Sequence, residues 1–462
     1  MLPKFAVRDM EPKKILLIGA GKSATTLIEY LLNHASIESW KLTVADMDPE
    51  LAQQKVGSSP FAEACALSIE DVPLRQSLIK AHDLIVSMLP AHMHIEVARD
   101  CVAFGKHMVT ASYVSAEMEA LHEQAEAKDL LLLNEMGVDP GIDHMTAMEV
   151  MVKIKAKGGK IIGFESFTGG LMAPGSEEGP WKYKFTWNPR NIVLAASGGA
   201  VKFLHGGKFK YIPYHKVFRR TELIDLGAYG EFEAYGNRDS LRYQSMYGLE
   251  GVDTLYRGTL RRPGFCQSWD VFVQLGATDD SYLMEGVDEM THRAFINSFL
   301  YYSPSDSVEL KLAHMLRLDL NSEPMRRLKW LGMFEDEPVG LSGKASPAMV
   351  LQHILQKKWS LAPQDRDMIV MVHLFDYECE GEHSLLRSHL VVEGDDAQST
   401  AMAKTVGLPM GIAIRNILNG TIAMRGVRIP VHKEIYAPVL AELSVHGIGM
   451  QETFLKGGLP PH

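Results

Sequence analysis

The sequence is poor in cysteine, with four among 462 residues. Cys65, Cys101, Cys266 and Cys379 lie far apart and never form a Cys-x-x-Cys pair, so neither a disulfide framework nor a cysteine-based metal site is predicted. The first residues, MLPKFAVRDMEPKK, lack the apolar core of a secretory leader. These absences favour a cytoplasmic protein with reduced thiols.

Long apolar runs and basic clusters are also missing. The longest uncharged stretches, such as Asn191–Val201, fall well short of the ~18–20 apolar residues of a membrane span. Lys and Arg total 47 against 57 Asp and Glu, a net charge of -10, whereas phosphate binding needs clustered cations. We therefore expect a small-molecule substrate, with neither a membrane nor nucleic acid as the partner.

Motifs for two other chemistries are absent. His92-x-His94 supplies at most half of a metal site, and no His-Glu-x-x-His motif or cysteine partner accompanies it, so no metal is predicted. A Gly-x-Ser-x-Gly elbow for acyl transfer is missing as well.

The residues that are present predict an α/β protein of two or three domains. In the first third, short apolar runs alternate with stretches of helical spacing, which is typical of a parallel, doubly wound sheet. The predicted strands are Lys14–Gly19, Lys41–Ala45, Asp83–Leu89, His107–Ser112 and Leu130–Glu135, and the predicted helices are Ser23–His34, His94–Phe104 and Ala116–Lys128.

The rest of the chain follows a different pattern. Its predicted strands are too widely spaced for a simple βαβ series, so we expect a mixed sheet; they are Lys160–Gly170, Phe209–Tyr214, Asp253–Arg262, Met368–Cys379 and Leu385–Glu393. A mainly helical stretch interrupted by prolines runs from about Glu285 to Lys358 and suggests a small helical insertion. Two further helices are expected near Ser399–Leu418 and Lys433–His446.

A glycine-rich turn follows the first predicted strand. Gly19, Gly21 and Ala24 fit Gly-x-Gly-x-x-Ala between a strand and a helix, and Lys22 and Ser23 complete the turn. Such a turn brings backbone N–H groups and a helix N-terminus to a pyrophosphate, which predicts dinucleotide binding; the alternative is a plain tight turn. A P-loop would need a glycine at position 16, which is Leu16.

The second predicted strand ends at Asp46. A carboxylate at this position accepts hydrogen bonds from ribose hydroxyls and repels a 2′-phosphate, which favours NAD over NADP. Asp48 is an alternative acceptor and Lys55 would weaken the preference, so NADP stays possible. The competing interpretation is a solvated loop aspartate.

Two polar clusters come after strand-like runs, where a parallel sheet collects its ligands. The first is Thr110–Tyr113 and the second is Asn134–His144, which includes Asp139. The alternative is structural, because Asp139-Pro140-Gly141 also suits a turn and Asp143 suits a helix cap.

A third cluster is rich in arginine. It joins Asn237–Ser240 with Arg257–Arg262, and guanidinium groups gathered in an acidic protein suggest bidentate binding of carboxylates. Surface ion pairing is the alternative.

At nearly full length the chain resembles the saccharopine dehydrogenases of the glutamate-forming type, also called saccharopine reductases. The stretches that carry the resemblance are DLIVSMLP (83–90), VTASYVS (109–115), NEMGVDPGIDHMTAME (134–149), GGLMAPG (169–175), YKFTW (183–187), YGNRDS (235–240), LYRGTLRRPGF (255–265), RDMIVM (366–371) and STAMAKTVGLPMGIAI (399–414).

The resemblance implies three domains and a homodimer. A Rossmann domain over 1–135 would be completed by C-terminal helices in 400–462. A second α/β domain for substrate binding and dimerisation would cover 136–284 and 359–399, and a small helical domain would cover 285–358.

The resemblance also implies residue roles. Ser112, Tyr113 and Asp139 match positions that contact substrate near the nicotinamide, and Arg238 matches a carboxylate-binding arginine. Leu89 matches a position lining the cofactor, and Thr259, Leu260 and Arg261 match a segment near the ligand. We expect Asp139 and Tyr113 to be the catalytic pair.

One loop departs from the family pattern. Where the family usually has Cys-Gly-Gly-Leu-Pro-Ala-Pro-Glu, this chain has Thr168-Gly-Gly-Leu-Met-Ala-Pro-Gly175. A proton-transfer role for the missing cysteine is therefore in doubt, and the loop is expected to fit substrate differently.

The leading hypothesis is NAD-dependent oxidation of L-saccharopine to L-glutamate and 2-aminoadipate 6-semialdehyde, or the reverse condensation, in lysine metabolism. The rivals are a related amine dehydrogenase, such as lysine 6-dehydrogenase or carboxynorspermidine synthase, and a cofactor-binding regulator without turnover. The arginine cluster favours the substrate with more carboxylates.

Overall fold

The computed structural model describes residues 11–455 and 459. Residues 1–10 of the N-terminal segment considered above, and residues 456–458 and 460–462 of the expected first domain, lie outside this description. The chain divides into two compact units. The first comprises Met1–Val150 and Ala403–Gly449, and the second comprises Met151–Met402 and Met450–His462.

The first unit is built on a parallel sheet of seven strands. In chain order these are β1 (Lys13–Ile18), β2 (Trp40–Asp46), β3 (Ala62–Ala66), β4 (Leu84–Ser87), β5 (His107–Thr110), β6 (Leu131–Leu133) and β15 (Gly426–Arg428). The spatial order is β15-β6-β5-β4-β1-β2-β3, and every pairing is parallel. Strand order reverses between β1 and β4, which is the switch point where such sheets bind ligands.

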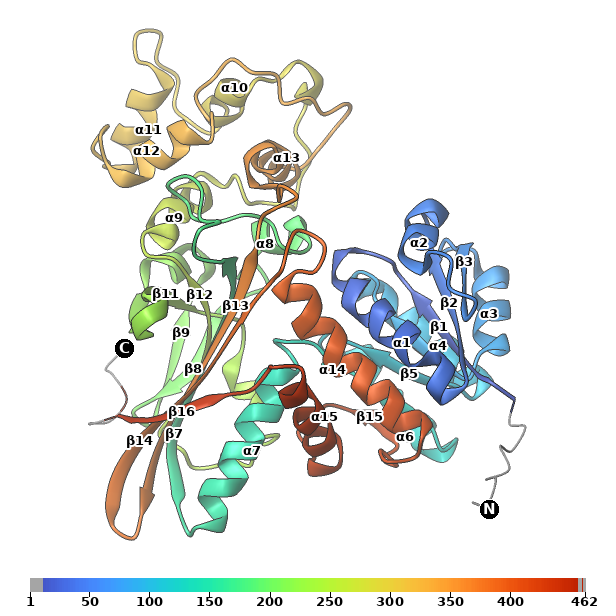
Figure 1. Cartoon of the computed structure of the whole chain (residues 1–462). Coiled ribbons are helices and arrows are strands. Elements are labelled where there is room, and N and C mark those ends of the chain that lie inside the picture. Colours follow the sequence, from blue (N-terminus) through green and yellow to red (C-terminus); the bar gives the residue numbers. More distant parts are fainter. Residues whose placement is uncertain (1–10, 456–458, 460–462) are drawn as a thin grey trace, which may run out of the picture. The chain divides into compact units, whose positions relative to one another are not determined.

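Helices connect and cover these strands (Figure 1). They are α1 (Thr25–Glu38), α2 (Pro49–Val56), α3 (Val72–Ala81), α4 (His94–Phe104), α5 (Ala116–Glu119), α6 (His122–Ala127), α15 (Lys433–Val445), and parts of α7 (Ile142–Ala156) and α14 (Ala401–Leu418). The 3-10 turns η1 (Lys22–Ala24) and η2 (Ala91–Met93) precede α1 and α4. The expected helix Ala116–Lys128 is broken into α5 and α6.

Helix α14 packs closely on α1 because two of its residues are glycines. A Cβ on Gly407 would lie 2.5 Å from the backbone nitrogen of Leu27, and one on Gly411 would lie 2.5 Å from the Tyr30 ring. The hydroxyl of Tyr30 donates to Glu442 in α15 over 2.6 Å. The C-terminal helices α14 and α15 are therefore fastened to the first helix of the sheet.

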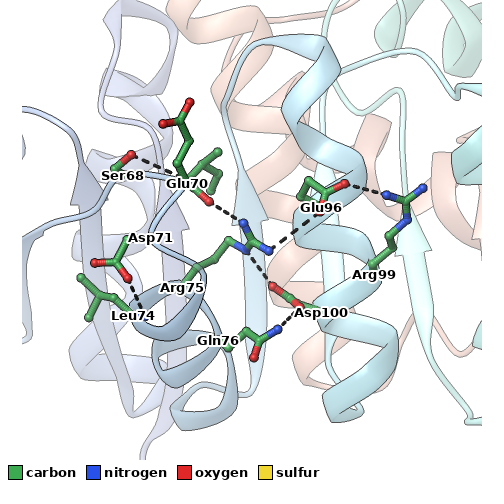
Figure 2. Close-up of polar contacts among 10 residues, drawn as sticks. Ser68, Glu70, Asp71, Leu74, Arg75, Gln76, Glu96, Arg99 and Asp100 are labelled. Atoms are coloured by element: carbon green, nitrogen blue, oxygen red, sulfur yellow. Dashed lines mark hydrogen bonds and ion pairs between the residues drawn. The ribbon is translucent and has the colours of Figure 1, made fainter.

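A buried ion pair fastens α4 to α3 (Figure 2). Arg75 Nε donates to Asp100 Oδ2 over 2.7 Å, and the same guanidinium donates to the carbonyl of Ile69. Gln76 donates to the other carboxylate oxygen of Asp100 over 2.9 Å. Removing one partner of such a pair typically destabilises a protein by about 3–5 kcal/mol. The pair therefore fixes the helix that begins at His94.

The second unit is built on a mixed sheet of nine strands. They are β7 (Lys160–Met172), β8 (Val201–His205), β9 (Lys208–Ile212), β10 (Thr221–Asp225), β11 (Glu231–Gly236), β12 (Thr254–Arg261), β13 (Asp367–Cys379), β14 (Glu382–Glu393) and β16 (Gln451–Leu455). The main path is β10-β11-β12-β7-β13-β14-β16, with β8 pairing β12 and β9. Among the described strands of this sheet, only β12 and β7 pair in parallel. The expected mixed sheet is thus present, and β16 belongs to it, although the family resemblance implied that the helices of 400–462 complete the first domain.

Helices of the second unit gather around one aromatic core. They are α8 (Pro189–Val193), α9 (Phe265–Leu275), α10 (His292–Asn297), α11 (Val308–Leu316), α12 (Glu323–Trp330) and α13 (Pro347–Trp359). Trp181, Trp269 and Trp359 are buried at its centre. Phe295 and Leu312, from the helical stretch, join the same hydrophobic cluster. The fold class is therefore α/β, with a Rossmann unit and a mixed-sheet unit that includes the helical segment.

Among the described residues, no helix is both long and apolar enough to cross a membrane.

Candidate dinucleotide and acid–base site

The glycine turn after β1 is sterically determined at Gly19. Its φ is +105°, and a Cβ there would lie 2.7 Å from the carbonyl oxygen of Met88. Its N–H donates to the carbonyl of Ala45 over 2.8 Å, which draws the turn against β2. A side chain at this position would therefore push β1 away from the segment after β4.

The next glycine leaves room for a ligand. A Cβ on Gly21 would meet nothing within 4 Å, so the protein itself does not need a glycine there. Lys22 is exposed, Ser23 is half-buried and Ala24 is buried, as helix α1 begins directly after them. An open backbone at a helix N-terminus fits a dinucleotide pyrophosphate.

Asp46, the last residue of β2, is tied to the glycine turn. Its Oδ2 accepts the Ala20 N–H over 2.6 Å and its Oδ1 accepts the Asp48 N–H over 3.0 Å. Asp48 caps α2 by accepting from the N–H groups of Glu50 and Leu51. Lys55 donates to the Thr25 hydroxyl over 2.6 Å. Asp46 is therefore no loosely solvated aspartate, and Asp48 already has a structural role.

A hydrogen-bonded chain joins the ends of β4 and β5. The Nδ1 of His94 lies 2.8 Å from the Ser87 hydroxyl, and its Nε2 lies 2.7 Å from the Ser112 hydroxyl. Ser87 and His94 are buried, Ser112 is half-buried, and Leu89 is half-buried two residues beyond β4. Burial lowers the pKa of His94 to about 4, so its imidazole is neutral at pH 7.

Tyr113 and Asp139 are in direct contact. The Tyr113 hydroxyl donates to Asp139 Oδ1 over 3.1 Å, which joins the loop after β5 to the loop after β6. Both side chains are half-buried. A phenol beside a carboxylate at the carboxyl edge of a parallel sheet is a suitable arrangement for proton transfer.

The buried carboxylate of Glu135 holds the backbone beside this pair. Glu135 Oε1 accepts the Val114 N–H over 3.0 Å, and its Oε2 lies 2.8 Å from His144 Nε2. Asp143 accepts the Gly141 N–H over 2.6 Å, as a residue in the first turn of α7. The polar segment 134–144 thus fixes the backbone on both sides of Asp139.

The arginines of the second unit differ in their environments. Arg238 is exposed, follows β11 and has a φ of +56°. Arg262 is paired with Glu177 at 2.5 Å, and the Arg257 guanidinium lies 4.3 Å from the centre of the Tyr243 ring. Pairing with Glu177 removes Arg262 from the candidates for ligand binding.

Arg261 is a buried cation that makes no ion pair among the described residues, although the buried Glu233 lies opposite it in the register of β11 and β12. Its guanidinium lies 5.2 Å from the Tyr183 ring, 5.8 Å from the Tyr235 ring and 5.4 Å from the Phe265 ring. Nη1 donates to the carbonyl of Leu260, while the buried Nε finds no partner. A charge held this way suits an anionic ligand.

The segment that departs from the family pattern was expected to be a loop, but Thr168–Met172 lie in strand β7, next to the expected ligand segment. Thr168 in β7 pairs with Thr259 in β12, and a Cβ on Gly169 would lie 2.6 Å from the carbonyl oxygen of Leu260. The buried Thr168 hydroxyl has no hydrogen-bond partner among the described residues. Thr259 is half-buried and Leu260 is buried.

The structure brings together Ser112, Tyr113 and Asp139 in the first unit, near the ends of β5 and β6. Arg238, Thr259 and Arg261 belong to the second unit, along β11 and β12. The Ser87–His94 pair was not singled out from the sequence, whereas Glu135 and His144 belonged to the predicted polar cluster 134–144 without a role of their own. The sequence feature that could have marked the Ser87–His94 pair is a polar residue within an otherwise apolar segment. His94 was considered only as part of a metal site. Within the described residues, no group of three or more His, Cys, Asp or Glu side chains suits a metal.

Two family profiles match the chain. Residues 15–133 match the saccharopine dehydrogenase NADP binding domain, and residues 137–448 match the saccharopine dehydrogenase C-terminal domain. The two matches together span both units.

Known proteins are similar over most of the chain. The saccharopine dehydrogenase [NADP(+), L-glutamate-forming] of Schizosaccharomyces pombe is 31% identical over 96% of this chain and 99% of that protein. The mitochondrial alpha-aminoadipic semialdehyde synthase of Bos taurus is 33% identical over 94% of this chain, but this chain spans only 47% of its length. The apo saccharopine dehydrogenase (L-Glu forming) of Saccharomyces cerevisiae has a TM-score of 0.84 and 27% identity, with 96% of this chain and 100% of that chain covered.

Proposed function

The chain belongs to the saccharopine dehydrogenase family, and from this premise we propose that it oxidises the CH–NH bond of L-saccharopine in lysine metabolism. L-saccharopine, NAD+ and water would give L-glutamate, 2-aminoadipate 6-semialdehyde, NADH and a proton, and the reverse condensation follows the same path. The observation that carries the proposal is the hydrogen bond from Tyr113 to Asp139, at the sheet edge that also carries the glycine turn.

The chemistry requires three proton transfers: one from the secondary amine before the hydride leaves, one from the water that adds to the imine, and one to the departing amine. Bound nicotinamide supplies the acceptor for the hydride that leaves the carbon next to the secondary amine. Asp139 takes a proton from the water that adds to the imine, and Tyr113 donates toward the same carboxylate, which keeps it oriented. The pair then returns a proton to the departing amine as the carbinolamine collapses.

Substrate binding requires cations, because saccharopine carries three carboxylates. We assign one to Arg261, whose buried guanidinium makes no ion pair among the described residues. We assign another to Arg238, which is exposed beyond β11. Ser112 contributes a hydroxyl beside the catalytic pair, and Thr259 lies in the strand that ends at Arg261.

Gly19, Gly21, Lys22, Ser23 and Ala24 are assigned to the pyrophosphate, and Leu89 to the nicotinamide side. The profile for 15–133 and the Schizosaccharomyces pombe relative are named for NADP, which supports a nicotinamide dinucleotide. Our finer proposal is a preference for NAD, because the carboxylate of Asp46 at the end of β2 would repel a 2′-phosphate. Lys55 is directed to Thr25 instead.

The test is the formation of reduced cofactor by the purified chain. Saccharopine, lysine and carboxynorspermidine are each supplied with NAD+ and with NADP+, and glutamate and the semialdehyde are identified as products. We expect saccharopine-dependent NADH formation. A homodimer, which the family resemblance implies, is checked by light scattering on the same preparation.

The other outcomes identify the rivals. Turnover of lysine without turnover of saccharopine would assign the chain to the lysine 6-dehydrogenases. Cofactor binding without turnover of any of the three amines would support a regulator, and would overturn the proposed activity.

A further inference from the structure

The hydroxyl of Ser112 does not stand alone in the site, because His94 connects it to a buried serine. Ser87 is fully buried at the end of β4, and its hydroxyl has one hydrogen-bond partner among the described residues, His94 Nδ1 at 2.8 Å. The other ring nitrogen of His94 lies 2.7 Å from the Ser112 hydroxyl. One imidazole therefore spans the two hydroxyls.

The charge state of His94 restricts how these contacts are made. Burial lowers its pKa, with the charge of His92 adding to the effect, so the ring carries one proton at neutral pH. A neutral imidazole donates through one nitrogen and accepts through the other. Which nitrogen donates is decided by the serines on either side.

The buried serine decides the tautomer. If Nδ1 carried the proton, it would donate to the Ser87 oxygen and leave the Ser87 hydroxyl proton without an acceptor inside the protein. A buried donor without an acceptor is costly, so the Ser87 hydroxyl donates to Nδ1 and the proton lies on Nε2. Nε2–H then donates to the oxygen of Ser112.

We propose that His94 is a positioning residue that makes Ser112 a hydrogen-bond donor to a substrate carboxylate, an inference that rests on the proposed function. Because the Ser112 oxygen already accepts from Nε2–H, its own proton is available to a ligand. The Ser112 backbone is held as well, since its N–H donates to the Thr110 hydroxyl over 3.3 Å and its carbonyl accepts from the Glu135 N–H over 3.1 Å. Saccharopine carries three carboxylates, and any of them could accept the hydrogen bond from the Ser112 hydroxyl.

The helix that carries His94 is fixed independently of the site. Arg75 and Asp100 join α4 to α3 at 2.7 Å (Figure 2). His94 is the first residue of α4, so its ring is placed by a helix that does not depend on the ligand. This arrangement suits a residue that holds a substrate-binding hydroxyl in one orientation.

The first test is the tautomer itself. Ring-15N-labelled histidine is incorporated, and long-range proton–nitrogen spectra are recorded on the full chain without substrate, with the His94 signals identified by their loss in His94→Gln. We expect a protonated Nε2 and a bare Nδ1. A proton on Nδ1 overturns the inference and leaves the proposed function untouched.

The second test is a double-mutant cycle on saccharopine turnover. His94→Leu should lower kcat/KM by about 10- to 100-fold, mainly through KM, with NADH affinity unchanged in a fluorescence titration. His94→Gln should stay within about threefold of the parent, because its amide oxygen accepts from Ser87 and its amide nitrogen donates to Ser112. In a Ser112→Ala background, His94→Leu should cost less than about twofold.

The contrary results are distinct. An equal loss from His94→Leu with and without Ser112 would show that His94 only stabilises the fold, and would overturn the inference. A His94→Gln variant as impaired as His94→Leu would overturn it too. If the unmodified chain has no saccharopine activity, the proposed function fails together with the carboxylate assignment, whereas the tautomer result still reports on the ring.

Discussion

The Tyr113 hydroxyl donates to Asp139 Oδ1 over 3.1 Å, and this contact joins two loops whose strands are neighbours in the parallel sheet. The contact lies at the same carboxyl edge as the glycine turn, so a dinucleotide and an acid–base pair would share one side of the first unit. Glu135 holds the loop backbone at Val114, which leaves the pair little freedom to separate. Preorganisation of this kind is what general acid–base catalysis requires.

Asp139→Asn should lower kcat for saccharopine by about 10²–10⁴-fold, because the amide cannot take up a proton. The Asn oxygen still accepts from Tyr113, so the melting temperature should stay near that of the parent. Turnover and thermal unfolding are measured on the same preparation. A fully active Asn variant would show that Asp139 only shapes the loop, with the proton passing to Tyr113 or solvent.

Cofactor choice should depend on the charge of Asp46. Asp46→Asn keeps an oxygen for the Ala20 N–H but removes the repulsion of a 2′-phosphate, so the ratio of kcat/KM for NAD+ to that for NADP+ should fall by at least about tenfold. Asp48→Asn is the matched control, since Asn caps α2 equally well and the same charge is lost two residues away. A parent enzyme with the higher efficiency for NADP+ would contradict our assignment of Asp46.

A change at Arg261 should affect function far more than stability. Arg261→Met should lower kcat/KM for saccharopine, with a loss of transition-state stabilisation of about 2–5 kcal/mol, because it removes the buried guanidinium that binds a substrate carboxylate. The free energy of unfolding without ligand should fall little, since Arg261 makes no ion pair among the described residues and Glu233, opposite it in β11, keeps the hydrogen bonds from the N–H groups of Gly264 and Cys266.

Arg262→Met is the neighbouring control for that change. Arg262 is paired with Glu177, so its loss should destabilise the fold and leave the KM for saccharopine nearly unchanged. Unchanged saccharopine kinetics in Arg261→Met would remove Arg261 from the substrate site.

Much of the fold could be predicted because the apolar runs are short and strongly patterned. The predicted helix His94–Phe104 agrees with α4, and the strand predicted at Met368–Cys379 differs from β13 by one residue at its start. β10 and β11 were missed because the charged residues in TELID and EFEAYG obscure the pattern of a strand. β16 escaped notice because four of its five residues are exposed, so no hydrophobic alternation marks it.

The candidate site was predictable only where a motif places residues at a strand end. Tyr113 and Asp139 satisfied that rule, and the structure places them in contact. His94 lacked such a signal, because its partners Ser87 and Ser112 are brought to it by the sheet and not by spacing along the chain. The different environments of Arg261 and Arg262 also depend on tertiary packing, because Arg262 meets Glu177 whereas Arg261 makes no ion pair among the described residues.

Thr168 in β7 is the clearest departure from the family pattern, and its hydroxyl is buried without a partner among the described residues. Thr168→Val should raise the free energy of unfolding by about 1 kcal/mol, because it removes an unsatisfied polar group while keeping the branched shape. If the hydroxyl meets a ligand beside Thr259, kcat/KM for saccharopine should fall by roughly 2- to 10-fold. A stabilised variant with unchanged kinetics would show that Thr168 has no part in binding.

The buried, neutral His94 should make folding depend on pH below neutrality. Its pKa in the folded chain is about 4, below the unfolded value of about 6.5, so the unfolded chain binds more protons as the pH falls. The stability associated with neutral His94 is present in full above pH 6.5 and is lost progressively toward pH 4, by up to about 3 kcal/mol. His94→Gln does not titrate, so its free energy of unfolding should fall less than that of the parent between pH 7 and pH 4.5. Urea unfolding of both proteins across this range measures the difference, and parallel pH profiles would mean that His94 titrates alike in the folded and the unfolded chain, contrary to a pKa lowered by burial.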